Sequence, residues 1–355
     1  MILEGKRILV TGGTGSLGKV LVQRLLSGEI ATPSKVVVLS RDEAKQHEMR
    51  LSYLHRTVAT DEVIYENFRR ALEFRIGDVR DYADVCSALR DADVVVNAAA
   101  LKQVPTCEYF PEQALLTNCQ GPVNIVRAIR EHGFPVETVV GVSTDKACKP
   151  VNVMGMTKAL QERIFISSNI LTPGTRFVCV RYGNVLASRG SVIPLFHAQI
   201  ARGGPVTVTV PEMTRFLLSL DQAVDTVLAA LRFARPGETF VPRVPAATVI
   251  DIARALIGER RIEIREIGIR AGEKMHESLV SEEECYHTVW RDGFYVIRPV
   301  VPELRNDDAP ALEPLGREYS SADSVAGLEE TAELLRRNRL MVRDVDLDER
   351  EELLR

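Results

Sequence analysis

Residues 7–18 read RILVTGGTGSLG, a short apolar run followed by a cluster of glycines. Gly13, Gly15 and Gly18 have the spacing G-x-G-x-x-G, which joins the first strand to the first helix in dinucleotide-binding folds. One glycine is expected to form the tight turn, one to let the backbone approach a pyrophosphate, and one to let the helix pack on the strand. The start of the helix then offers free N–H groups to the phosphates. The residues expected around these phosphates are Gly12, Thr14, Gly15, Ser16 and Leu17.

Short apolar runs alternate with segments of helical periodicity as far as residue 181. Six strands are predicted, at residues 7–11, 35–40, 73–78, 93–98, 138–143 and 176–181. Their hydrophobicity is continuous, which is typical of parallel strands buried on both faces. Helices are expected between them, including residues 111–131 and 153–169. The pattern predicts an α/β fold, with a Rossmann-type doubly wound parallel sheet and a smaller C-terminal α/β domain for the substrate.

The regular alternation ends after residue 181, where glycines and prolines interrupt short strands and helices. Residues 1–180 are expected to form the dinucleotide-binding domain, to which some later segments return. Residues 181–300 are expected to form the substrate-binding region. Residues 301–355 are interpreted as a C-terminal extension that serves as an interface or a latch.

Composition limits the class of protein. The chain has 355 residues, 45% of them hydrophobic and 26% charged, and a mean hydropathy of -0.02, as in ordinary globular proteins. Neither a membrane-spanning run nor a secretory signal is visible, so a cytoplasmic protein without a membrane partner is expected. A net charge of -4 argues against nucleic acid as a partner. The six cysteines lack metal-ligand spacing, so reduced thiols and no structural metal are expected.

The end of the second strand indicates which dinucleotide binds. An NAD-binding fold usually places an acidic residue there, on the ribose 2′-hydroxyl. This chain has Ser40 and Arg41 instead, and Arg41 and Lys45 can bind a 2′-phosphate, so NADP is favoured over NAD. Asp78 is expected at the adenine, with a helix cap as the alternative role. The other residues expected against the cofactor are Val79, Ala98, Ala99 and Ala100.

The fifth predicted strand ends in Thr144, Asp145 and Lys146, at the edge of the sheet where ligands of open α/β folds bind. An aspartate beside a lysine at such an edge is a candidate acid/base pair. Met154 and Lys158 lie four residues apart on the next predicted helix and therefore share one of its faces.

The glycine loop, Thr144 and the position of Lys158 resemble the extended short-chain dehydrogenase/reductase superfamily, whose pattern has a catalytic tyrosine where this chain has Met154. One branch is more similar, namely the UDP-N-acetylglucosamine 4,6-dehydratases of bacterial capsule, O-antigen and flagellin-glycan synthesis. The resemblance to this branch covers residues 5–285. The stretches that carry it are residues 98–105, 143–147, 181–185, 188–194, 213–216 and 272–277.

This resemblance implies a reaction in which the cofactor takes a hydride from C4 of the sugar and returns it to C6. Between these steps Lys146 removes the C5 proton and Asp145 protonates the departing C6 hydroxyl. Lys146 must then be neutral, which requires a lowered pKa, and Asp145 must be protonated. Met154 cannot accept the proton of the C4 hydroxyl. Thr144 is therefore expected to position that hydroxyl, and Lys158 to accept its proton as well as to bind the cofactor.

The resemblance also implies a set of substrate contacts. Asn184 and Arg215 match the residues that hold the nucleotide diphosphate. Arg270 and Glu273 match an arginine that meets phosphate and a carboxylate that binds ribose hydroxyls. Lys102 and Arg189 are expected to face the sugar nucleotide. The alternative for Arg270, Glu273, Lys102 and Arg189 is a salt bridge at the domain interface.

The expected activity is that of a UDP-N-acetylglucosamine 4,6-dehydratase that inverts C5, in a homo-oligomer that is a hexamer or a dimer. A UDP-sugar 4-epimerase is the alternative, since it removes the same hydride. An epimerase does not need the pair Asp145 and Lys146, which counts against it. A non-catalytic dinucleotide sensor is a further alternative, suggested by the missing tyrosine.

Overall fold

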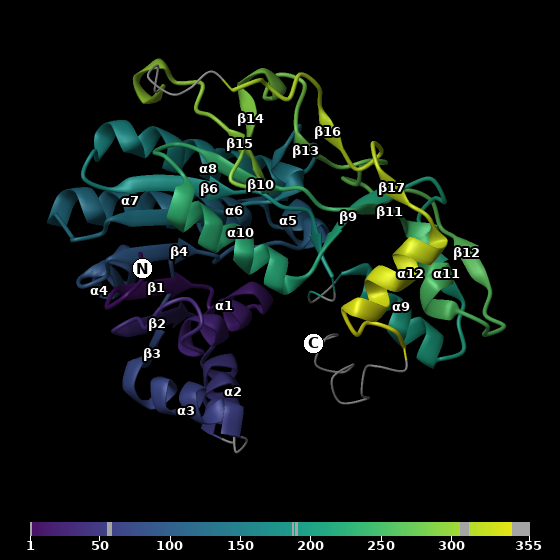
Figure 1. Cartoon of the computed structure of the whole chain (residues 1–355), viewed down its shortest axis with the longest axis horizontal. Coiled ribbons are helices and arrows are strands. Elements are labelled where there is room, and N and C mark those ends of the chain that lie inside the picture. The colour runs from purple at the N-terminus through teal and green to yellow at the C-terminus, as the bar shows by residue number, and fades with distance from the viewer. Residues whose placement is uncertain (1, 55–58, 187, 189–190, 306–311, 343–355) are drawn as a thin grey trace.

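A nine-stranded sheet organises the larger part of the chain (Figure 1). The computed structural model describes residues 2–54, 59–186, 188, 191–305 and 312–342. Six parallel strands lie in the order β3-β2-β1-β4-β5-β6, so the chain winds outward from β1 in both directions. This is the Rossmann order, in which ligands bind beside β1 at the carboxyl ends of the strands. The strands are β1 (Arg7–Thr11), β2 (Lys35–Ser40), β3 (Leu72–Ile76), β4 (Val94–Asn97), β5 (Thr138–Val142) and β6 (Arg176–Val180).

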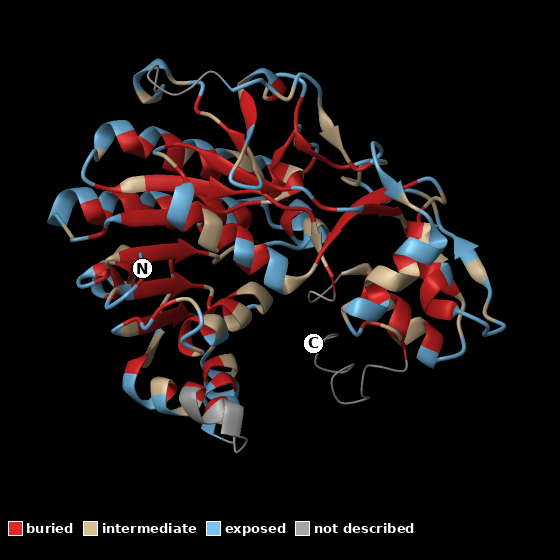
Figure 2. Ribbon diagram, in the orientation of Figure 1, coloured by how far each residue is buried: buried red, intermediate tan, exposed pale blue. Residues whose placement is uncertain are grey.

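Both faces of this sheet are buried, as the continuous hydrophobicity of its strands predicts. Ile8 and Val10 of β1 pack in the core on one face, whereas Leu9 packs in the core on the other. Figure 2 shows the strands between the helical layers as almost uniformly buried. The first face carries α1 (Ser16–Leu26) and α10 (Leu220–Phe233), and the second α4 (Tyr82–Leu89), α7 (Gly121–His132) and α8 (Val153–Leu171).

Shorter helices surround these layers. Met49 of α2 and Phe68 of α3 extend the core on the face of α1. The segment that leads into α7 contains a π-helical turn, η1, which places Asn118 beside the loop after β4. These elements are α2 (Glu43–Leu54), α3 (Ala59–Ala71), α5 (Val104–Tyr109), α6 (Pro111–Leu115) and η1 (Leu116–Gln120).

Three later strands extend the same sheet. β10 (Thr239–Pro242) runs parallel to β6, whereas β15 (Phe294–Ile297) and β14 (Thr288–Arg291) form an antiparallel edge. All six predicted strands are confirmed, each within two residues of its expected ends. The prediction of a purely parallel six-stranded sheet was incomplete, because these strands are only four residues long and lie where glycines and prolines interrupt the sequence pattern.

A smaller lobe lies beside the carboxyl edge of the main sheet (Figure 1). Its core includes Phe196 of α9, Ile252 of α11 and Leu335 of α12, so the C-terminal extension contributes to this core. The helices are α9 (Val192–Ala201), α11 (Val249–Ile257) and α12 (Leu328–Arg337). One sheet pairs β17 (Val325–Ala326), β11 (Ala246–Thr248), β9 (Thr214–Leu218) and β7 (Asn184–Val185). Two-stranded sheets pair β12 (Ile264–Glu266) with β8 (Val206–Val208), and β13 (Ser278–Val280) with β16 (Tyr319–Ser320).

The described residues also contain three 3-10 turns: η2 (Asp145–Ala147), η3 (Cys285–His287) and η4 (Pro302–Leu304). All six cysteines are free, and five of them are buried, which confirms the prediction of reduced thiols. Within the described part of the chain, no helix combines the length and the apolar character that a membrane crossing requires.

Arg181 forms a buried ion cluster next to the end of β5. Its Nη2 lies 2.7 Å from Oε2 of Glu162 on α8, and its Nη1 lies 2.7 Å from Oε2 of Glu284. Glu162 also accepts a hydrogen bond of 2.5 Å from Oγ of Ser143. The side chains of Arg181 and Glu162 are only 3% and 5% exposed, so each charge depends on the other. The cluster thereby fixes the residue that precedes Thr144.

Replacing Glu162 with alanine is expected to lower the free energy of unfolding by about 3 kcal/mol, because Arg181 then keeps a buried charge with one partner removed. Urea unfolding followed by circular dichroism measures this loss. The matched control is Glu263→Ala, which removes a surface pair with Arg265 and should cost below about 1 kcal/mol. Equal losses in the two variants would contradict the structural role of the cluster.

Candidate active site

A cleft of about 860 Å³ opens between the carboxyl edge of the main sheet and the smaller lobe. It collects every residue that the sequence predicted for the site, apart from Arg189, which lies outside the described residues. On the cofactor side the predicted residues in the cleft are Gly12, Thr14, Gly15, Ser16, Leu17, Arg41, Lys45, Asp78, Val79, Ala98, Ala99 and Ala100. The others are Lys102, Thr144, Asp145, Lys146, Met154, Lys158, Asn184, Arg215, Arg270 and Glu273.

The glycine loop has the geometry that a dinucleotide requires. Gly12 has φ of +66°, and a Cβ there would lie 2.8 Å from the backbone of Ala99. Gly18 packs so closely on the loop that a Cβ would lie 2.4 Å from Cα of Gly13. Gly12 therefore forms the tight turn. This corrects the expectation that one of Gly13, Gly15 and Gly18 forms it. Among the described residues no side chain caps the start of α1 at Gly15, so its first N–H groups face the cleft and fit a pyrophosphate.

Charged side chains surround the expected position of the 2′-phosphate. Nη1 of Arg41 lies 3.6 Å from Oδ2 of Asp78, which also binds Arg80 at 2.5 Å. Burial raises the pKa of Asp78, but the hydrogen bonds from Arg80 and the charge of Arg41 outweigh burial and hold this pKa below its usual value. The alternative that Asp78 caps a helix is wrong, because Asp81 caps α4.

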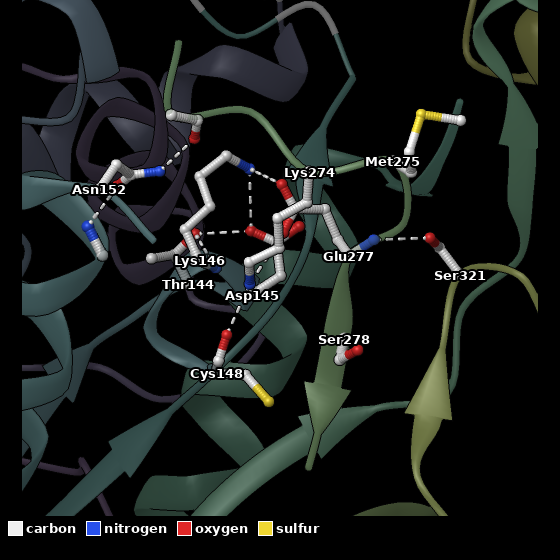
Figure 3. Close-up of polar contacts among 12 residues, drawn as sticks. Thr144, Asp145, Lys146, Cys148, Asn152, Lys274, Met275, Glu277, Ser278 and Ser321 are labelled. Carbon is white, nitrogen blue, oxygen red and sulfur yellow. Dashed lines mark hydrogen bonds and ion pairs between the residues drawn. The ribbon is translucent and has the colours of Figure 1, made fainter. Parts of the chain in front are cut away.

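The candidate acid/base pair, Asp145 and Lys146, lies on the 3-10 turn η2, which follows β5. Asp145 is fully buried, and its Oδ1 accepts hydrogen bonds from Oγ1 of Thr144 at 2.8 Å and from Nζ of Lys146 at 3.0 Å. Oγ1 of Thr144 in turn accepts a hydrogen bond from the backbone N–H of Lys146. Figure 3 shows the three side chains turned toward one another. The turn therefore presents a hydroxyl, a carboxylate and an amine at one point of the cleft.

Lys146 also contacts a second carboxylate, that of Glu277, which the sequence did not assign to the site. Nζ of Lys146 lies 3.3 Å from Oε1 of Glu277. Burial opposes the charge on Lys146, but Asp145 and Glu277 outweigh burial and raise the pKa of the amine above its ordinary value. The expectation was that burial together with a positively charged nicotinamide makes Lys146 neutral, and burial alone does not lower this pKa.

The segment of residues 272–277 is docked against the residues that follow η2. Nδ2 of Asn152 donates a hydrogen bond of 2.7 Å to the carbonyl of Gly272. Nζ of Lys274 donates one of 2.7 Å to the carbonyl of Cys148. A signal for Glu277 exists in the sequence, since it directly precedes the apolar residues of β13, but periodicity cannot place it beside Lys146.

Helix α8 forms the adjoining wall of the cleft. A Cβ at Gly155 would lie 2.2 Å from the carbonyl oxygen of Lys146, so glycine is needed where the helix meets the turn. Met154 is 4% exposed and packs with Cys107 and Ala114. Nζ of Lys158 donates hydrogen bonds to the carbonyl of Val142 at 2.5 Å and to Oε1 of Gln161 at 2.7 Å. Burial lowers the pKa of Lys158 to about 8.

Asn118 is a further residue that the sequence did not single out. Its amide exchanges hydrogen bonds with the backbone of Leu101, at 2.8 Å and 3.0 Å, and donates one of 3.0 Å to Oγ1 of Thr157. It therefore ties the loop after β4 to α8. The sequence shows only that Asn118 is a polar residue. Its position beside Leu101 depends on the π-helical turn η1, which hydrophobic periodicity does not predict.

The substrate half of the cleft contains buried oxygen atoms that lack a hydrogen-bond partner among the described residues. Arg215 is 7% exposed and donates to the backbone carbonyl of Thr214, whereas Arg270 and Lys102 are exposed at the cleft. Carboxylate and amide oxygens without donors indicate a ligand rich in hydroxyl groups, such as a sugar. These oxygens are Oδ2 of Asp145, Oδ1 of Asn184 and Oε2 of Glu273.

The Polysaccharide biosynthesis protein family matches residues 8–299 of this chain. The chain belongs to this family. Two members from Rickettsia carry the name UDP-glucose 4-epimerase. That of Rickettsia typhi (strain ATCC VR-144 / Wilmington) is 44% identical over 297 residues, 82% of each chain. That of Rickettsia conorii (strain ATCC VR-613 / Malish 7) is 45% identical over 284 residues, 79% of each chain.

Solved structures agree with this family assignment. Pen from Bacillus thuringiensis superposes with a TM-score of 0.84 at 33% identity, over 96% of this chain and 100% of that chain. DesIV, a dTDP-glucose 4,6-dehydratase from Streptomyces venezuelae with NAD and TYD bound, shares the fold, with a TM-score of 0.64 at 22% identity over 76% and 86%. This member of the polysaccharide biosynthesis family is thus a nucleotide-sugar modifying enzyme of the short-chain dehydrogenase/reductase superfamily, and the family uses NAD or NADP.

Gly12→Ala is expected to weaken dinucleotide binding at least about tenfold, because the strained φ and the contact with Ala99 displace the loop. Parallel fluorescence titrations with NADPH and NADH measure this effect and also test the preference for NADP. Gly133→Ala is the control, since Gly133 has φ of +60° at the end of α7 but open space around an added Cβ. We expect this control to bind like the unaltered protein. Undiminished binding by Gly12→Ala would contradict the assigned loop.

Proposed function

We propose that this chain is an NADP-dependent UDP-N-acetylglucosamine 4,6-dehydratase that inverts C5. Its product is a UDP-2-acetamido-2,6-dideoxy-hexos-4-ulose for bacterial surface polysaccharide or glycan synthesis. The observation that carries the proposal is the hydrogen bond of 3.0 Å between Nζ of Lys146 and Oδ1 of Asp145 in the cleft. Loss of water across C5 and C6 needs a base at C5 and an acid at the C6 oxygen, and this pair supplies both.

One proton transfer creates the acid and the base together. In the free enzyme Lys146 is an ammonium ion beside the carboxylate of Asp145. A proton that moves along their hydrogen bond leaves a neutral amine on Lys146 and a carboxylic acid on Asp145. The amine then takes the C5 proton, and the acid protonates the C6 hydroxyl, which leaves as water. These two transfers return the pair to its starting charges, and C5 takes up a proton from solvent when hydride is added at C6.

Thr144 and Lys158 are proposed to act on the C4 hydroxyl. Oγ1 of Thr144 faces the cleft and can position this hydroxyl. With a pKa of about 8, the amine of Lys158 is partly neutral near pH 7.5 and can accept the proton. Met154 offers only a weak thioether acceptor and does not compete for it. The loop from Gly12 to Leu17 would hold the cofactor, and NADP, when bound, supplies the oxidation at C4 and the reduction at C6.

The proposed substrate contacts are inferred from positively charged side chains in the cleft and from oxygen atoms that lack a hydrogen-bond donor among the described residues. Arg215 and Arg270 line the cleft and are proposed to bind the diphosphate, which guanidinium groups recognise through paired hydrogen bonds. Asn184 and Glu273 have acceptor oxygens free for sugar or ribose hydroxyls. The assignment of uracil and of N-acetylglucosamine rests on the sequence resemblance.

A UDP-sugar 4-epimerase is the second candidate, because the Rickettsia relatives at 44% and 45% identity carry that kind of name. Both reactions begin with oxidation at C4, so Thr144 and Lys158 serve either one. Only the dehydratase needs the acid/base pair of Asp145 and Lys146, which favours dehydration here.

We also propose a homo-oligomer, a dimer or a hexamer, in which a face formed by α5, α6, η1 and α8 is covered. These helices contact one another, and exposed apolar side chains lie along them. The molar mass in solution tests this proposal. The side chains are Tyr109, Phe110, Leu115, Leu116, Met156 and Leu160.

Incubation with UDP-N-acetylglucosamine in D₂O is expected to produce a sugar that has lost one water and carries deuterium at C5. Mass spectrometry and NMR detect these changes, and the coupling pattern assigns the configuration. Asp145→Asn and Lys146→Met should each lower the rate at least about 100-fold while still binding the cofactor. An unchanged formula with a new configuration at C4 would instead identify an epimerase.

The oxidation at C4 is expected to speed up with pH through about 8, because the neutral form of Lys158 is the proton acceptor and burial lowers its pKa to that value. Single-turnover formation of the reduced cofactor, followed by absorbance, measures this rate. The pH dependence should disappear in Lys158→Met and persist in Lys149→Met, whose amine pairs with Glu318 outside the cleft. Wild-type rates in Lys158→Met would exclude Lys158 as the acceptor.

A further inference from the structure

Glu277 reaches the catalytic pair from a distant part of the sequence. It lies directly before β13, and its side chain is 2% exposed. Its Oε1 lies 3.3 Å from Nζ of Lys146, while Oδ1 of Asp145 lies 3.0 Å from the same nitrogen. Figure 3 shows Lys146 between these two carboxylates. The amine therefore faces twice the negative charge that a simple Asp–Lys pair would place beside it.

The backbone of Glu277 is held on both sides. Its N–H donates a hydrogen bond of 2.9 Å to Oγ of Ser321, and its carbonyl accepts one of 2.8 Å from the N–H of Ser321. Three residues before Glu277, Lys274 binds the carbonyl of Cys148 after η2, and five residues before it, Gly272 binds Asn152 at the start of α8. These contacts give the carboxylate a fixed place beside Lys146, so its charge acts on the amine at constant distance.

Other charged groups face this cluster. Lys274 lies 3.5 Å from Oε2 of Glu277, on the side away from Lys146. Arg215 on β9 acts on Lys146 with the opposite sign to the carboxylates. Burial and Arg215 both oppose the charge of Lys146, yet Asp145 and Glu277 together keep the pKa of the amine raised. The carboxylates therefore decide the charge of this amine in the free enzyme.

We propose that Glu277 is a positioning residue that holds Lys146 as an ammonium ion in the free enzyme and thereby sets the pH at which this amine becomes a base. Its attraction favours the proton on Nζ of Lys146 over the proton on Asp145. Glu277 thus opposes the proton transfer from Lys146 to Asp145 that produces the neutral amine and the carboxylic acid. The meaning of this effect for catalysis rests on the proposed function, but the charge of Lys146 can be measured without any sugar nucleotide.

Competitive labelling measures that charge directly. Acetic anhydride reacts only with the neutral amine, and Lys146 lines the cleft with 19% of its side chain exposed. The rate of acetylation of Lys146, read by mass spectrometry across pH against an added free amino acid, reports its pKa. In Glu277→Gln this pKa is expected to fall by about 1 to 3 units, so labelling at a fixed pH rises at least about tenfold. Glu282→Gln is the matched control, because Glu282 is 72% exposed and pairs with Lys149.

A second variant tests the sign of the effect. Lys274→Met removes a positive charge next to Glu277 and is expected to raise the pKa of Lys146, so acetylation slows. Opposite shifts in Glu277→Gln and Lys274→Met cannot come from general loosening of the site, which would move both variants the same way. An unchanged pKa in Glu277→Gln, or an equal fall in Glu282→Gln, would overturn the proposal.

The same variants connect the charge to the reaction. At a fixed pH, incorporation of deuterium at C5 should be faster in Glu277→Gln, because the proton then moves more readily from Lys146 to Asp145. A labelling shift without deuterium incorporation in any variant, the unaltered enzyme included, would leave the role of Glu277 intact and count against the dehydratase proposal. A deuterium profile that stays unchanged in Glu277→Gln while labelling shifts would overturn the control of the base by Glu277.

Discussion

Lys146 keeps its charge between two buried carboxylates, and much of the surrounding chain is arranged to hold these three groups in contact. Charges taken out of water cost several kcal/mol each unless close partners compensate them. Asp145 obtains its compensation from Thr144 and Lys146 within one short turn. Glu277 must be brought from a distant segment, so the hydrogen bonds of Asn152 and Lys274 are needed to dock that segment on the turn.

The sheet makes this assembly possible because its parallel strands end at one edge. The end of β1 supplies the glycine loop, the end of β5 supplies η2, and β7 and β9 of the smaller lobe bring Asn184 and Arg215 to the opposite wall. The buried cluster of Arg181 and Glu162 anchors β5, β6 and α8 behind this edge. The proposed reactive side chains are thus attached to the buried main sheet, while the proposed substrate contacts come from the lobe beside it.

Features encoded locally were predictable from the sequence, and features made by contacts between distant segments were not. The strands and the adjacent pair Asp145 and Lys146 follow from apolar runs and strand ends, which are local patterns. The strands β14 and β15 and the contact of Glu277 depend on how far-separated segments meet, which periodicity does not encode. Burial of Lys146 was predicted, but its contact with a second carboxylate was not, for the same reason. Even in the glycine loop, spacing alone did not show that Gly12 has the positive φ.

The same contacts bear on the choice between dehydration and epimerisation. Relatives with similar overall sequences share the scaffold, and a scaffold supports more than one reaction, so their names weigh less than the site itself. An epimerase returns hydride to C4 and leaves C5 and C6 untouched. An epimerase therefore does not require the buried carboxylate of Asp145 hydrogen-bonded to the amine of Lys146, with Glu277 acting on the charge of that amine. Burying these charged groups costs free energy. A dehydratase needs such a pair. It also needs Lys146 to stay protonated until oxidation at C4 has made the C5 proton acidic, and Lys146 is protonated in the free enzyme.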